Sequence, residues 1–352
     1  MSRTTLQHYM KLLAPGTPLR AGIDRILHSG TGALIVLGFN RQVKQVSSGG
    51  FQIGIDFSEQ ALRELAKLDG AIIVSNDLSR ILSAGVHLVP PGDIPTAETG
   101  TRHRSADRTA QATAVPVVTV SASMGTVSLF IAGRRHVVEK ASDVISRANQ
   151  TLAAMTSLIN RLQEALDQLN SLEVAEQVTL RDLIAVAHRY ELARRLSAET
   201  EFHVEVLGVE GRLLKMQHAE LAAPLGGLST LIASDYAHNL DDPDEFQLEN
   251  LQNFTPEELM NNHLVAQRLG FGPDSYLETP LESVGYRMLT TVGRLPRHVV
   301  DLLVPKHSLQ ELFAASVGEL MRIEGIGDRR ARLIRDALLR ISETAFARSD
   351  TA

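Results

Sequence analysis

Two short motifs in this chain combine residue types that bind and activate phosphates. Asp69-Gly70-Ala71 places a carboxylate just before an apolar run, and Gly100 to Ser105 supplies two guanidinium groups around an imidazole. The second motif, Thr101-Arg102-His103-Arg104-Ser105, also brings flanking hydroxyls and backbone N–H groups. Each motif alone is more typical of an ordinary turn or a solvated basic loop. Together they indicate nucleotide chemistry, with phosphate as the ligand.

The elements around these motifs are expected to place them at strand ends. Residues 67–75 predict a tight turn that feeds a β-branched strand, so Asp69 is expected at a strand entrance. Residues 85–91 predict a short returning strand, and the Arg-His-Arg triplet is expected in the loop that follows. Gly30-Thr31-Gly32 precedes a strand instead of following one, so we interpret it as a turn and not as a dinucleotide-binding loop.

Residues 1–138 alternate short apolar strands with helical segments and glycine turns, which is typical of an α/β or α+β domain with a central mixed sheet. A helix is predicted at 58–68, and strands are predicted at 33–37, 71–74, 115–120, 126–132 and 135–138. From residue 139 to about 232 the pattern changes to long helices without internal proline before Pro224. Apolar residues recur there at alternating spacings of three and four: Leu152, Met155, Ile159, Leu162, Leu166 and Leu169. This pattern predicts a packing seam, and we expect a helical bundle that acts as a spacer, with further helices near 179–197 and 201–221.

Residues 233–283 are interpreted as a helical connector. The run Asp241-Asp242-Pro243-Asp244-Glu245 is acidic and contains proline, so a solvated boundary is favoured over a metal site. Thr255 and Glu258 have the spacing of a capping box and predict a helix start.

Composition limits the classes of protein that this chain can belong to. Its 352 residues exceed the usual size of one hydrophobic core, so two or three domains are expected. The absence of cysteine excludes a disulfide framework, a thiol nucleophile and a cysteine-ligated metal. The first residues lack a signal-peptide pattern, and no apolar run approaches the ~20 residues of a membrane span. We therefore expect a cytoplasmic protein with no membrane association.

The last segment, residues 284–352, is expected to bind DNA. Residues 320–334 resemble the helix-hairpin-helix motif, in which Gly325-Ile326-Gly327 would bring backbone N–H groups against a phosphate. Arg329, Arg330, Arg332 and Arg335 would contact neighbouring phosphates without reading bases. Residues 284–341 contain ten Lys and Arg against six Asp and Glu, a net charge of +4 in a chain of net charge −6. A degenerate copy at 292–298 is expected to pair with the first and to contact DNA through Arg294 and Arg297. The alternative is that these C-terminal helices dock another protein and do not bind DNA.

The two N-terminal motifs and this C-terminal pattern resemble, over nearly the whole chain, the DisA family of DNA integrity scanning proteins, which carry a diadenylate cyclase domain. The resemblance implies condensation of two ATP molecules into cyclic di-3′,5′-AMP with loss of two pyrophosphates. Each 3′-hydroxyl must attack the α-phosphorus of the other nucleotide, so two cyclase domains must face each other.

By this resemblance Asp69 would bind Mg²⁺ or Mn²⁺ and help to deprotonate the attacking hydroxyl, and Arg102, His103 and Arg104 complete the catalytic set. Gly70, Ala71 and Leu88 would contact the nucleotide, while Thr101 to Ser105 grip the triphosphate. Residues 121–125 are small or polar where some relatives carry arginines. The phosphate charge would then be balanced by Arg102, Arg104 and the metal, or by a residue of a second copy such as Arg134 or Arg135.

The resemblance also implies an octamer, branched or recombination-intermediate DNA as the regulatory ligand, association with the nucleoid, and a recombination factor of the RecA type as a partner. Two other functions compete. One is a DNA-binding repair scaffold that binds ATP without turnover. The other, a DNA-cleaving enzyme that uses the acidic residues near Asp241, is disfavoured because these residues lie in a proline-broken segment.

Overall fold

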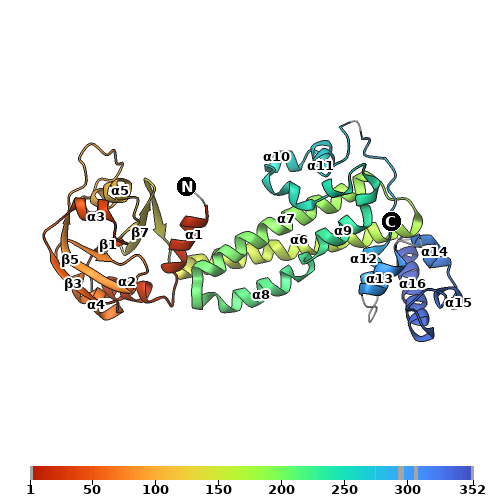
Figure 1. Cartoon of the computed structure of the whole chain (residues 1–352), viewed down its shortest axis with the longest axis horizontal. Coiled ribbons are helices and arrows are strands. Elements are labelled where there is room, and N and C mark those ends of the chain that lie inside the picture. Colours follow the sequence, from red (N-terminus) through yellow and green to blue (C-terminus); the bar gives the residue numbers. More distant parts are fainter. Residues whose placement is uncertain (1–2, 274, 292–296, 305–307, 350–352) are drawn as a thin grey trace. The chain divides into compact units, whose positions relative to one another are not determined.

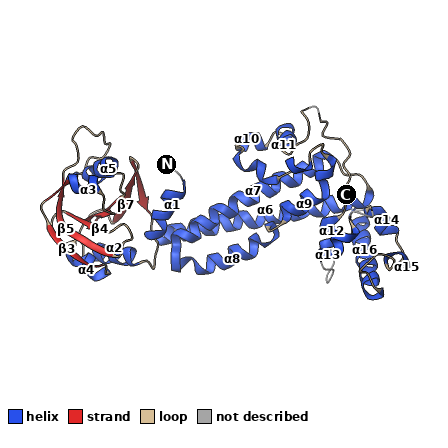
Figure 2. Ribbon diagram, in the orientation of Figure 1, coloured by secondary structure: helices blue, strands red, loops and turns tan. Residues whose placement is uncertain are grey.

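A computed structural model describes residues 3–273, 275–291, 297–304 and 308–349 (Figure 1). The chain forms two compact units, which are described separately. The first combines the residues up to Gln150 with Glu201–Met216, and the second combines Thr151–Thr200 with the residues from Gln217 onward. Among the described residues, all strands lie in the N-terminal part and the remainder is helical (Figure 2).

A mixed sheet forms the centre of the first unit, as predicted. β1 (Ala33–Leu37) pairs in parallel with β4 (Ala71–Val74) and antiparallel with β6 (Val117–Ser121). Beyond β6 the sheet continues through β7 (Thr126–Ile131) and β8 (Arg134–Val138). On the other side, β5 (Arg80–Leu88) pairs with β4, and both β2 (Ser47–Ser48) and β3 (Phe51–Asp56) pair with β5.

Helices cover both faces of this sheet because successive strand residues point to opposite sides. Ile35 and Leu37 lie in one apolar core with α2 (Pro18–His28) and α4 (Glu59–Leu65). Leu34 and Val36 lie in a second core with α3 (Arg41–Val46) and α5 (Thr101–Thr113). Figure 1 shows the two pairs of helices on opposite faces. In the same unit, Lys11 of α1 (Arg3–Leu12) pairs with Glu205 at 2.7 Å.

Three local expectations need correction. The Arg-His-Arg triplet lies in the first turn of α5 and not in a loop. Helix α4 ends at Leu65, and a turn then leads to Asp69. The sequence pattern also missed β3, because this edge strand is mostly exposed and lacks a buried apolar face.

The long helices are α6 (Ala141–Ala175) and α7 (Leu180–Leu207), followed by η1 (Gly208–Gly211) and α8 (Arg212–Ala222). The predicted seam of α6 is confirmed, since five of its residues are buried and Ile159 is half-buried: Leu152, Met155, Leu162, Leu166 and Leu169. Helices α6 and α7 each contribute to both compact units, and the expected role of this region as a spacer stays a prediction.

The expected helical connector, residues 233–283, contains several short helices and belongs to the second unit, whose core includes some of its apolar residues. The acidic residues Asp241 to Glu245 are exposed, but Phe246, Leu248 and Leu251 directly after them are fully buried. This region contains η2 (Ala223–Leu225), α9 (Leu228–Tyr236), η3 (Ala237–Asn239), η4 (Pro243–Glu245), η5 (Leu248–Asn253), α10 (Pro256–Leu259) and α11 (Asn262–Arg268). The capping box of Thr255 and Glu258 is confirmed at the start of α10.

The C-terminal helices share one apolar core, which contains residues from both hairpin regions such as Val299, Val300, Ile326 and Ile334. They are α12 (Tyr286–Thr291), α13 (Arg297–Leu303), α14 (Leu309–Ala314), α15 (Val317–Leu320) and α16 (Asp328–Ser349). Most of the degenerate hairpin, including Arg294, Leu295 and Pro296, lies outside the described residues. Within the described part of the chain, no helix has the length and apolar character needed to cross a membrane.

Candidate active site

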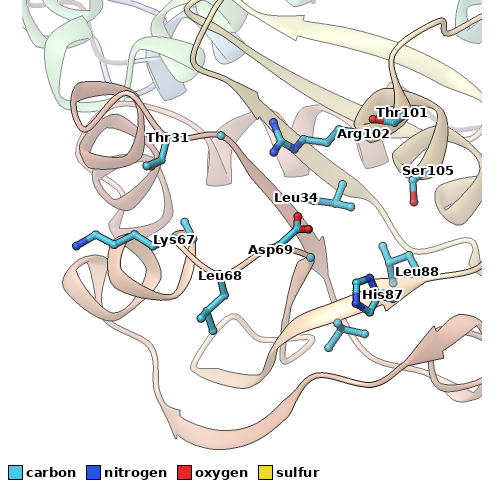
Figure 3. Close-up of a pocket in the computed structure, with 14 residues that line it drawn as sticks. Thr31, Leu34, Lys67, Leu68, Asp69, His87, Leu88, Thr101, Arg102 and Ser105 are labelled. Carbon is cyan, nitrogen blue, oxygen red and sulfur yellow. The ribbon is translucent and has the colours of Figure 1, made fainter.

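A pocket of about 620 Å³ lies where β1 and β4 begin and β5 ends (Figure 3). It brings together residues from both N-terminal motifs. The predicted residues that line it are Asp69, Gly70, Leu88, Thr101, Arg102 and Ser105. The carboxylate motif and the anion-binding motif are therefore two walls of one cavity.

Gly70 positions Asp69 at the entrance of β4. Its φ of +116° is in a region that side chains disfavour, and an added Cβ would lie 2.7 Å from the Gly85 carbonyl carbon and 2.9 Å from the Val86 nitrogen. Only glycine lets the chain pass this close to β5. Asp69 itself is exposed, and Figure 3 shows its carboxylate pointing toward the side of the pocket formed by Leu34. Ala71 is fully buried as the first residue of β4.

Helix α5 provides the anion-binding wall. Its N-cap residue, Gly100, has no side chain to bond the first-turn N–H groups. These N–H groups and the positive end of the helix dipole make the terminus suitable for a phosphate. Thr101, Arg102 and Ser105 of the first two turns line the pocket. The positive charge of Arg102 adds to the same site.

The other two residues of the triplet point elsewhere. His103 is buried, and its ring centroid lies 5.9 Å from that of Phe130. Burial lowers the pKa of the imidazole, and nearby Arg135 and Arg102 lower it further against the opposing effect of Glu98. All but one of these influences favour the neutral imidazole. Arg104 is exposed, and neither residue is among those that line the pocket. Their predicted catalytic roles stay predictions.

The segment before α5 is fixed by three polar side chains. Arg135 on β8 pairs with Glu98 at 3.2 Å and donates through Nε to the Ser128 hydroxyl at 3.0 Å. Arg108 donates to the Ile94 carbonyl oxygen at 2.9 Å, and Gln111 to that of Pro95 at 3.2 Å. Arg135 is thus engaged within its own chain, and the expected contact of Arg134 or Arg135 with phosphate of a second copy stays a prediction.

Sequence reasoning missed the other pocket residues, which come from segments far apart in the chain. They are Thr31, Gly32, Leu34, Ala66, Lys67, Leu68, Val86 and His87. Gly30 does form the expected turn, with a φ of +68°, but the residues after it also line the pocket. Lys67 and Leu68 directly precede the Asp69 motif, so proximity to that motif was the available signal. His87 is exposed and lines the pocket.

The donor set fits a hard divalent cation that is held largely by its substrate. Asp69 is the acidic side chain among the residues that line the pocket. Among the residues that the structure describes, no group of three or more His, Asp or Glu could hold a metal by itself. Mg²⁺ commonly binds one or two carboxylates together with substrate phosphates and water. Asp69 beside the phosphate-binding helix matches that pattern.

The C-terminal hairpin presents backbone and charge to solvent. Gly325 has a φ of +85°, Gly327 is open on its exposed side, and the buried Ile326 anchors the turn in the core. Arg329, Arg330 and Arg332 are exposed, although Arg330 donates to the Gly325 carbonyl oxygen at 2.7 Å. Arg332 pairs with Asp328 at 3.0 Å.

Arg335, which was also expected to contact phosphate, is half-buried. It donates to the Phe313 carbonyl oxygen at 2.5 Å. Contact of the hairpin with DNA stays a prediction.

Two family models match this chain. Residues 20–135 match the model described as DisA bacterial checkpoint controller nucleotide-binding, and residues 138–277 match the DisA bacterial checkpoint controller linker region. A DNA integrity scanning protein DisA from Cutibacterium acnes is 46% identical over 336 residues, which cover 95% of this chain and 98% of that protein. The protein of the same name from Parafrankia sp. is 45% identical over 342 residues, covering 95% and 94%. The solved structure of DacA from Staphylococcus aureus aligns with a TM-score of 0.30 and 22% identity, covering 34% of this chain and 84% of that one.

Proposed function

The chain belongs to the DisA family of DNA integrity scanning proteins and is a diadenylate cyclase, and from this premise we propose that branched DNA bound at its C-terminal hairpin regulates the cyclase. The cyclase activity is supported by one observation: Asp69 and the N-terminus of α5 line the same pocket. The exposed glycine hairpin and its arginines support the regulatory part.

The reaction joins two ATP molecules through two new 3′–5′ phosphodiester bonds. Each ribose 3′-oxygen attacks the α-phosphorus of the other nucleotide, and each attack expels one pyrophosphate and releases one proton. Each domain has one anion-binding helix terminus in this pocket, which suits one triphosphate. The second ATP is therefore held by a second copy that faces the first across a two-fold axis. Higher assembly, up to an octamer, would bring several such pairs together.

Some pocket residues act on the attacking 3′-hydroxyl, and others bind the triphosphate and the departing pyrophosphate. A bound Mg²⁺ or Mn²⁺ would lower the pKa of the attacking hydroxyl and balance phosphate charge. Asp69 would hold this cation and orient the 3′-hydroxyl. The N–H groups of the first α5 turn, the Thr101 and Ser105 hydroxyls and the Arg102 guanidinium bind the triphosphate and stabilise the charge on departing pyrophosphate. Leu88 contacts the nucleoside at the end of β5.

DNA binding at the hairpin would follow shape and not base sequence. Backbone N–H groups at Gly325 and Gly327, with exposed Arg329 and Arg330, are groups that contact phosphates. A local net charge of +4 over residues 284–341 within a chain of net charge −6 directs DNA to this end. Such a protein would associate with the nucleoid when it binds DNA, and a RecA-type recombination factor bound to the same DNA would be a partner.

The test is to measure cyclic di-AMP synthesis while a four-way DNA junction is titrated in, with a linear duplex of the same base composition as control. The proposal predicts that the junction changes the rate and that the duplex changes it less. In the Arg329→Ala/Arg330→Ala variant the ratio of the rates with and without junction should move toward one. Equal ratios for junction and duplex, or an unchanged ratio in the variant, would contradict regulation through the hairpin.

A further inference from the structure

Arg102 and Gly32 approach each other closely across the pocket. If Gly32 carried a Cβ, that atom would lie 2.2 Å from Arg102 Nη1 and 2.9 Å from Arg102 Cζ. Atoms cannot approach this closely, so the guanidinium occupies the space that a side chain at position 32 would need. Figure 3 shows Arg102 reaching from α5 toward the segment at Thr31, just before β1 begins.

Backbone conformation does not explain the glycine at position 32. Gly30 and Gly70 have φ values of +68° and +116°, where other residues are strained. Gly32 is not among the residues with positive φ, so an L-residue could adopt its backbone conformation. Besides the guanidinium, the near neighbour of an added Cβ is the Val120 carbonyl oxygen, at 3.0 Å. The main obstacle to a side chain at position 32 is Arg102.

We propose that Gly32 is a positioning residue for the cyclase reaction: its missing side chain provides the place where the Arg102 guanidinium rests above the start of β1. This inference rests on the proposed role of Arg102 in binding the triphosphate of ATP. The guanidinium then faces the same space as the free N–H groups of the α5 first turn. Polyphosphate would bind between the helix terminus and the guanidinium in this position.

Fixing the guanidinium matters because arginine is long and flexible. A free arginine side chain must lose rotamer freedom when it binds phosphate, and a planar donor that is already placed loses less. Catalytic geometry also tolerates little displacement, since groups must lie within about 0.5 Å of their productive positions. A methyl group at position 32 would push the guanidinium further than this.

The experiment compares Gly32→Ala with Gly92→Ala in the full-length protein. Gly92 is exposed, is not among the residues with positive φ, and has no atom within 4 Å of an added Cβ, so it controls for the change from glycine to alanine. Gly32→Ala is expected to raise the KM for ATP, or lower kcat/KM, by about tenfold or more, the effect of losing a charged hydrogen bond. The melting temperature and the circular dichroism spectrum should stay as in the native protein. Gly92→Ala should leave the kinetics unchanged.

A double-mutant cycle shows whether Gly32 acts through Arg102. Arg102→Ala removes the displaced group, so Gly32→Ala should add little further loss in that background. If the two losses multiply instead, Gly32 acts on its own and the inference is wrong. If Gly32→Ala has native kinetics while Arg102→Ala is impaired, the inference fails and the proposed role of Arg102 stands. If Arg102→Ala itself has native kinetics, the phosphate-binding role fails and the inference fails with it.

Folding gives a second readout. If Gly32→Ala alone does not fold, adding Arg102→Ala should restore folding, because the steric conflict is with that side chain. If the double variant also fails to fold, glycine is required at position 32 because of the nearby Val120 carbonyl and not because of Arg102, and the inference is wrong.

Discussion

Arg135 lies 3.2 Å from Glu98, and this pair links strand β8 to the segment that leads into the N-terminal end of α5. Both side chains are partly buried, at 31% and 19% exposed. Glu98 precedes Gly100, whose position sets where the free N–H groups of α5 point. Neither residue lines the pocket, so we expect the pair to act on the site only by holding this segment in place.

Breaking this pair should weaken ATP binding more than it weakens the fold. Arg135→Met and Glu98→Gln are each expected to raise the KM for ATP a few fold. The free energy of unfolding should fall by at most about 1 kcal/mol, because partly exposed ion pairs contribute little. Steady-state kinetics and urea unfolding measure the two effects. The double variant should resemble either single variant; a strictly multiplicative loss would show that the two residues act separately.

A buried ionic network joins the C-terminal helices to the long helices within the second unit. Arg287 on α12 donates to both carboxylate oxygens of Glu173 on α6 at 2.8 Å, and both side chains are nearly inaccessible. Its backbone N–H faces both oxygens of Asp235 at 3.3 Å. Tyr236 donates to the same Glu173 carboxylate, and Gln310 donates to the Glu173 carbonyl oxygen.

Removing the single cation from this network should be strongly destabilising, because it leaves two buried carboxylates without a counter-charge. Arg287→Leu is expected to lower the free energy of unfolding by about 3–5 kcal/mol. Arg181→Leu breaks an exposed pair with Glu278 and is the matched control, with an expected loss of at most about 1 kcal/mol. Denaturant unfolding followed by circular dichroism measures both. Equal losses in the two variants would contradict the structural role of the network.

The same network predicts a pH dependence of stability. Burial, reinforced by neighbouring Glu173 and opposed by Arg287, raises the pKa of Asp235 to about 7 from its ordinary value of 3.8. The folded state therefore holds this proton more tightly than the unfolded state does. Stability should fall as pH rises from about 4 to about 7, with no further loss from this group above that range. Asp235→Asn should flatten the profile between about pH 4 and 7, as followed by thermal unfolding. A variant profile with the native slope would assign the dependence to other groups.

Exposed hairpin arginines should contribute to DNA affinity through phosphate contacts. Arg329→Ala is expected to weaken binding of junction and linear DNA alike and to reduce the slope of log affinity against log salt by about 1. Fluorescence anisotropy over a range of salt concentrations measures this. Arg181→Ala, far from the hairpin in sequence and exposed, is the control. A native salt slope in Arg329→Ala would exclude a phosphate contact at that residue.

The sequence predicted those elements whose buried positions are occupied by apolar residues in a regular pattern. Strands 33–37 and 71–74 match β1 and β4 because both are continuous β-branched or aliphatic runs that are buried on both faces. Edge strand β3 was missed because its exposed residues need no apolar pattern. Helix α5 was expected to be a loop, since its N-cap is a glycine and its first residues are polar. The burial of Phe246 was not predicted, because this residue directly follows an exposed acidic run.

The candidate site was only partly predictable for a related reason. Asp69 and Arg102 could be found because each belongs to a short motif with its own chemistry. Gly32 and His87 could not, because a glycine or an exposed histidine gains meaning only from what the fold places beside it. The sequence also assigned one role to all of Arg102, His103 and Arg104. The helix directs successive residues to different faces, so only Arg102 of these three reaches the pocket.

The most direct test of the account is product analysis with an Asp69→Asn variant. Native protein and variant are incubated with ATP and Mg²⁺ or Mn²⁺, ATP binding is measured in parallel, and products are identified by mass spectrometry. The account predicts cyclic di-AMP from the native protein and none above background from an Asp69→Asn variant that still folds. Synthesis by Asp69→Asn at the native rate would place the chemistry outside this pocket and contradict the account.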